Sequence, residues 1–163
     1  MSADWVTPML LSMRVAAVAT VAVACVATLV AWAMRRFSFV GKAAVDTLLT
    51  LPMVVPPTVT GFVLLVLLGR NGPVGRFLQA CLGVQVLFTW WAAAVASAVV
   101  AFPLMYGTLK AGLDSIDESL EKAGRTLGAS EVKVFFTITL PLAWPSFVAG
   151  LLLTVMRALG EFG

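Results

Sequence analysis

The chain has 163 residues, of which 61% are hydrophobic and only 12% are charged, and its mean hydropathy is +1.02. A chain of this length cannot fold so apolar a composition into one core beneath a polar shell, which excludes a soluble domain and indicates a membrane protein. The net charge of +3 is accounted for by loops that flank membrane spans and does not favour nucleic acid as a partner. With no histidine and two separate cysteines, the sequence supports neither a metal site nor a disulfide.

Four apolar runs are each long enough for a helix that crosses the hydrocarbon, which needs roughly 20 residues. We predict spans at about 8–34, 43–69, 86–112 and 138–160, in one transmembrane domain over 1–163. The N-terminus lacks the basic region and cleavage site of a signal peptide, so the first span should be retained. The sequence therefore predicts an all-α polytopic membrane protein.

The second span is interrupted by prolines, which remove backbone donors and disfavour helix at the preceding residue. It must bend or break near Pro52, Pro56 and Pro57. Freed carbonyls are tolerated at membrane depth where they line a water-filled path, so a translocation route and a purely structural kink both remain open. Our candidates for such a path are Pro56, Pro57, Thr58, Gly61 and, in the third span, Pro103. Asp46 is interpreted as the solvated start of the second span.

Basic residues gather in two of the short loops, which by the positive-inside rule should be cytoplasmic. The first loop holds Arg35, Arg36 and Lys42, and the second holds Lys110, Lys122, Arg125 and Lys133. This distribution places the N-terminus outside.

A polar segment at about 113–137 separates the third and fourth spans. Ser115 and Glu118 have the spacing of a capping box, which predicts a helix starting near Ile116. Gly128 should end that helix in a left-handed conformation, and Ser130 should cap a second helix that runs toward Leu140 and Pro141. The segment is therefore expected to form two helices that meet at Gly128.

The first of these helices is amphipathic, with Ile116, Leu120, Ala123 and Leu127 on one face. Such a helix can lie on a lipid surface or dock into a protein groove. Acidic side chains at 117, 118 and 121 weaken attraction to anionic lipid, so docking into a protein is favoured.

The spacing of this segment resembles the EAA signature of ABC importer permeases: Glu-Ala-Ala, three residues, Gly, nine residues, Ile, one residue, Leu-Pro. Gly128 through Pro141 follows it throughout, whereas Lys122 stands at the Glu position, with Glu121 one residue earlier, and Gly124 replaces the second Ala. The resemblance implies a type I ABC importer permease-like helical bundle whose polar segment contacts the ATPase. The coupling residues it implies are Glu121, Lys122, Ala123, Gly124, Leu127, Gly128, Ile138, Leu140 and Pro141.

The chain carries no GxxxxGK[ST] phosphate-binding loop, so it is not expected to be an enzyme or to bind a cofactor. The resemblance implies that a cytoplasmic ABC ATPase subunit uses the ATP. It also implies a periplasmic or extracellular substrate-binding protein, a second permease copy in a homodimer, and location in the bacterial cytoplasmic (inner) membrane.

Two further stretches, 51–73 and 88–105, resemble the molybdate permeases of that family. They imply molybdate, with tungstate as companion, while sulfate or thiosulfate is the alternative. Permeases of this family continue beyond the position of Gly163 into another span. We therefore expect a chain truncated after the fourth span, and an inactive truncated membrane fragment is a third interpretation.

Overall fold

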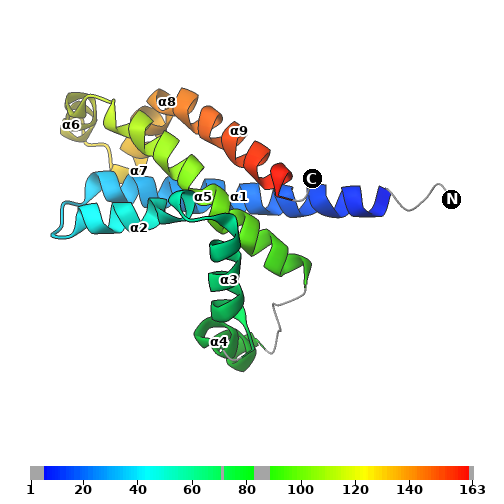
Figure 1. The fold of residues 1–163 in the computed structure, drawn as a ribbon. Helices are drawn as coiled ribbons and strands as arrows, with labels where there is room; N and C mark the ends of the chain where they lie inside the picture. The colour runs from blue at the N-terminus through cyan, green and yellow to red at the C-terminus, as the bar shows by residue number, and fades with distance from the viewer. Residues whose placement is uncertain (1–5, 71, 83–88, 162–163) are drawn as a thin grey trace.

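The computed structural model describes residues 6–70, 72–82 and 89–161, and every regular element in these ranges is helical (Figure 1). The elements are α1 (Val6–Arg36), α2 (Lys42–Val54), α3 (Pro57–Leu68), α4 (Pro73–Leu82), α5 (Trp90–Asp114), α6 (Glu118–Thr126), α7 (Glu131–Val134), the π-helix η1 (Phe135–Thr139), α8 (Leu140–Leu142) and α9 (Trp144–Gly160). The predicted all-α fold is confirmed.

The core lies where α5 packs against α1 and α9 (Figure 1). On α1 the buried face is a stripe of small residues that includes Ala19, Ala27 and Ala31. Small side chains allow two helix backbones to approach closely in lipid, where the hydrophobic effect supplies no drive between helices. Against this stripe α5 presents larger buried residues, among them Met105 and Leu109.

The second apolar run is broken where the prolines predict a break. Helix α2 ends at Val54, Val55 and Pro56 have extended backbone angles, and α3 starts at Pro57. Pro52 is accommodated inside α2. In Figure 1, α3 leaves the end of α2 at a steep angle and leads to α4, so the two halves of this run point in different directions.

The last apolar run is also bent. The helical stretch Glu131–Leu142 meets α9 at 73°, with Ala143 between them. By length and composition, three helical stretches in the described residues could cross a membrane, namely Val6–Arg36, Thr58–Phe77 and Trp90–Asp114. The bent pair makes a fourth candidate if it is counted as one span. Residues 86–88 of the predicted third span lie outside the described residues.

The contact between α5 and α9 depends on a missing side chain at Gly112, where an added Cβ would overlap the side chain of Ser146. We predict that Gly112→Ala forces the two helices apart and destabilises the fold by about 1–3 kcal/mol. Gly107, on the same helix, has nothing within 4 Å of an added Cβ and provides the control. Thermal unfolding in detergent should show a lower Tm for Gly112→Ala only; equal Tm values for the two variants would contradict this packing role.

Candidate functional site

Helix α6 begins at an aspartate and not at the predicted serine. Asp117 has an extended backbone, and its carboxylate accepts a hydrogen bond from the Ser119 amide at 2.8 Å. This bond lowers the pKa of Asp117 below its ordinary value. The predicted capping box of Ser115 and Glu118 is wrong because Ser115 still has helical angles at the end of α5, where its hydroxyl donates to the Gly112 carbonyl.

The end of α6 agrees with the prediction from Gly128. This glycine has φ of +83°, in the left-handed region. Its amide donates to the Arg125 carbonyl, and the next amide, of Ala129, donates to the Gly124 carbonyl, which together form a Schellman motif. The helix therefore ends at Gly128, three residues before α7 begins at Glu131.

The second helix of the polar segment is also confirmed. The Ser130 side chain accepts from the Lys133 amide, and the helix continues through the π-turns of η1 into α8. Leu140 and Pro141 are the first two residues of α8, with Leu140 partly buried and Pro141 exposed. Short π-helical insertions occur frequently at functional sites, because they shift the side chains that follow them around the helix axis.

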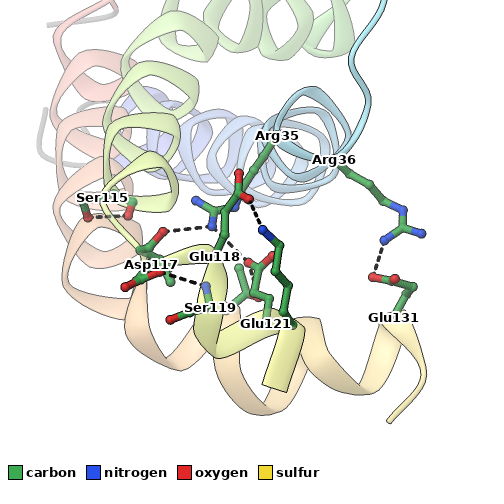
Figure 2. A network of polar contacts seen from close by, with 12 residues as sticks. Arg35, Arg36, Ser115, Asp117, Glu118, Ser119, Glu121 and Glu131 are labelled. Carbon is green, nitrogen blue, oxygen red and sulfur yellow. Dashed lines mark hydrogen bonds and ion pairs between the residues drawn. The ribbon is translucent and has the colours of Figure 1, made fainter. Parts of the chain in front are cut away.

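A buried carboxylate joins α6 to the rest of the protein (Figure 2). Glu121 is only 9% exposed, and Arg35, at the end of α1, approaches one of its carboxylate oxygens at 3.3 Å. The same oxygen accepts a hydrogen bond from the Thr139 hydroxyl at 2.9 Å, and Arg125 reaches the second oxygen at 3.3 Å. Arg35 also donates to the Ile116 carbonyl at 3.1 Å. Glu121 therefore ties together α1, α6 and η1.

A second ionic link lies beside the first. Glu131, the first residue of α7, pairs with Arg36 of α1 (Figure 2). It also accepts a hydrogen bond from Arg125 at 2.9 Å. Partial desolvation opposes its charge, but hydrogen bonds from Arg125 and Arg36 outweigh this effect and lower the pKa of Glu131. The carboxylate thus stays ionised at neutral pH, and its contribution is lost only as the pH falls through this lowered pKa.

Between α1 and the polar segment lies a cavity of about 510 Å³. Its polar wall carries the two ionic links, and its apolar wall includes Trp32 and Phe135, whose ring centroids are 5.5 Å apart. The cluster defined by Arg35, Arg36, Glu121, Arg125, Glu131 and Thr139 is called the anchor cluster below.

The apolar face of α6 points away from the bundle. Leu120 is 46% exposed and Leu127 is 88% exposed, and Ala123 between them is exposed as well. Of the predicted stripe, only Ile116 packs partly against the core. The anchor cluster therefore holds α6 by its polar face and leaves an apolar surface that no described residue covers.

Both departures from the EAA pattern have a structural counterpart. Lys122 is exposed and pairs with Glu118 at 3.0 Å, so the acidic side chain that points inward is Glu121. Gly124 is buried against the following helix, where an added Cβ would lie 2.7 Å from Cδ1 of Ile138. The structure thus brings Glu121, Gly124 and Ile138 together on the inner side of the segment, with Lys122, Leu127 and Gly128 outside.

The candidate path residues differ in burial. Pro56, Thr58 and Gly61 are exposed around the break between α2 and α3, and Pro57 begins α3. Pro103 is instead buried inside α5.

Sequence reasoning missed Arg35, Arg36 and Thr139 as members of the site. The two arginines were interpreted only as signals of membrane orientation, and Thr139 only as spacing within a motif. The contacts of the two arginines join residues more than 80 positions apart, and that of Thr139 spans 18, so no local pattern could have identified them.

The fold and the anchored polar segment define an integral membrane protein of the permease class. The chain belongs to the family described as binding-protein-dependent transport system inner membrane component, which matches residues 7–163. The resemblance inferred from the signature spacing is thereby confirmed.

Individual curated relatives show which permeases of this family the chain is similar to. The chain is 48% identical over 162 residues to the putative molybdenum transport system permease protein YvgM of Bacillus subtilis, covering 99% of this chain and 71% of the relative. It is 49% identical over 137 residues to the molybdenum transport system permease protein ModB of Haemophilus influenzae, covering 84% of this chain and 60% of the relative. The sulfate transport system permease protein CysT of Salmonella typhimurium is 37% identical over 135 residues, covering 83% and 48%. The chain thus spans about two thirds of the length of the molybdenum permeases.

The anchor cluster predicts a large effect of Glu121→Gln, which leaves the largely buried Arg35 without its counter-charge. Removing one partner of a buried ion pair costs on the order of 3 kcal/mol, so α6 should detach and its amides exchange faster with deuterated solvent. Glu118→Gln on the same helix removes an exposed carboxylate and should leave exchange nearly unchanged. Equal exchange rates in the two variants would contradict the anchoring role of Glu121.

Proposed function

We propose that the chain is the membrane subunit of an ATP-driven oxyanion importer, with molybdate and its close analogue tungstate as substrates. The observation that carries the substrate assignment is the identity with molybdenum permeases over nearly the whole chain. Identity with the sulfate permease is lower, which makes sulfate or thiosulfate the second candidate.

The role of the polar segment follows from its exposed apolar face. A helix that is fixed at its inner side and bears exposed Leu120, Ala123 and Leu127 is suited to dock into a groove of another protein. Because the chain lacks a phosphate-binding loop, the energy of ATP must be supplied by a partner. We assign that partner as a cytoplasmic ATPase subunit, and with it the cytoplasmic side of the membrane to α6 and α7 and the outer side to the N-terminus.

The anchor cluster gives this docking a mechanical consequence. A displacement of α6 by the ATPase is passed to α1 through the ion pair of Glu121 with Arg35 and to η1 through the hydrogen bond from Thr139. A second connection runs from Arg125 through Glu131 of α7 to Arg36 of α1. Rigid transmission of this kind lets nucleotide binding at the ATPase reorient the spans of a permease dimer. The oxyanion is then delivered from outside by a binding protein and released inside.

Reconstitution tests the whole proposal. The permease, its ATPase and oxyanion-binding protein are placed in proteoliposomes, and ATP turnover and uptake of labelled oxyanion are measured together. Molybdate-loaded binding protein should stimulate both, and sulfate-loaded binding protein should not. Stimulation by sulfate alone would transfer the assignment to the second candidate, and stimulation by neither would reject the importer.

The coupling role predicts different effects on transport for alanine substitutions at two glycines that both have a left-handed backbone conformation. Gly128 and Gly41 have φ of +83° and +93°, and an added Cβ meets nothing within 4 Å at either position. Alanine at each should cost about 1–2 kcal/mol through the left-handed conformation alone. Gly128→Ala should uncouple ATP turnover from oxyanion uptake. Gly41→Ala lies outside the polar segment and should leave turnover and uptake coupled. Equal loss in both would indicate general destabilisation.

A further inference from the structure

Asp46 is not the solvated start of a helix that its position predicts. The Tyr106 hydroxyl donates to one carboxylate oxygen of Asp46 at 2.5 Å, and the Lys110 ammonium lies 3.3 Å from the other. Tyr106 is completely buried in α5, and the Asp46 side chain is 33% exposed. These three residues, here called the Asp46 cluster, join α2 to α5.

Among the described residues, α2 is packed lightly. All thirteen of its residues are described and none is buried, although Leu49 packs partly against the core. An apolar groove of about 280 Å³ separates part of α2, around Leu48 and Pro52, from α1 and α5. At its far end α2 is cut from α3 by the extended residues Val55 and Pro56, so α3 does not continue it as one helix. The Asp46 cluster is therefore the main polar attachment of a weakly packed helix.

The cluster gives α2 a defined attached position. If α2 moved away, the Tyr106 hydroxyl would lose the carboxylate to which it donates and would need another acceptor, because an unpaired buried polar group is strongly unfavourable. Two arrangements, with α2 attached or released, are favoured over a continuous range between them. The break at Val55 and Pro56 provides the hinge for such a motion.

The cluster also lies close to the anchored polar segment. Lys110 pairs with Asp114 at 3.7 Å, and Asp114 is the last residue of α5. The next helix, α6, starts only four residues later at Glu118. Displacement of α6 would therefore act on the turn of α5 that carries Lys110.

We propose that Asp46 is a positioning residue of the transport cycle, which holds α2 against α5 through Tyr106 and Lys110 and releases it when the polar segment moves. This inference rests on the proposed function, since the route that α2 would close or open is the oxyanion path. The conformational part can be tested independently of transport.

The test measures how firmly α2 is attached in the complete, membrane-embedded transporter. Spin labels are placed at the exposed positions Thr47 on α2 and Leu152 on α9, with Cys25 and Cys81 replaced by alanine, and the distance distribution is recorded. With labelled permease diluted by unlabelled permease, so that the pair within one protomer dominates, the unaltered cluster should give one narrow distribution. Asp46→Asn and Tyr106→Phe should add a second population, because each removes part of the attachment.

The control variant changes the other carboxylate that pairs with Lys110. Asp114→Asn removes the other carboxylate that pairs with Lys110 but leaves the contacts between α2 and α5, so its distribution should match that of the unaltered protein. Lys110→Met should broaden the distribution and Lys110→Arg should restore it. A narrow distribution in Asp46→Asn, or equal broadening in Asp114→Asn, would overturn the proposal.

A functional measurement separates positioning from simple structural support. The ratio of oxyanion taken up to ATP hydrolysed should fall toward zero in Asp46→Asn and Lys110→Met. It should stay at the level of the unaltered protein in Lys110→Arg, with all variants inserted in equal amounts. Broadened distances with unchanged coupling would overturn the role in transport. If the unaltered transporter moves no oxyanion, the proposed function fails, and the distance measurement still decides whether the Asp46 cluster holds α2.

Discussion

The buried carboxylate of Glu121 is the contact on which the arrangement of the polar segment depends. A charge that is 9% exposed is tolerated only if it is paired and hydrogen-bonded, and here two arginines and a threonine satisfy it. Because these partners come from α1, α6 and η1, satisfying one group fixes three elements relative to each other. The exposed apolar face of α6 is a consequence of this arrangement, since the polar face is turned inward.

Regular helix is interrupted at two joints, one between α2 and α3 and one before α9. The prolines between α2 and α3 separate one apolar run into two directions, and the bend of 73° before α9 separates the polar segment from the last apolar helix. Each joint bounds an element that also carries a polar attachment, the Asp46 cluster on α2 and the anchor cluster on α6, α7 and η1. Helices that are stiff but joined in this way can move as units, with ion pairs determining which units move together.

Much of the fold was accessible from local pattern. Apolar runs of membrane length predicted the helices, and Pro56 and Pro57 predicted the break. Gly128 predicted the end of one helix in the polar segment, and Ser130 predicted the cap of the next. The capping residue of α6 was misassigned because a serine and an aspartate two positions apart both satisfy a capping pattern. Which of the two residues caps α6 depends on where α5 ends. The end of α5 is determined by its packing against α1 and α9, which the spacing of Ser115 and Glu118 does not predict.

The sequence by itself determined the class of protein, the positions of its breaks and the spacing of a segment typical of importer permeases, because hydropathy, proline geometry and glycine conformation act over a few residues. Only the tertiary structure decided that Glu121 and not Lys122 points inward, that Arg35 and Arg36 hold the polar segment, and that Asp46 joins α2 to α5. The physical reason is that a buried charge is satisfied by whichever group the packing brings within reach, and these groups lie 60 or more residues apart in the chain.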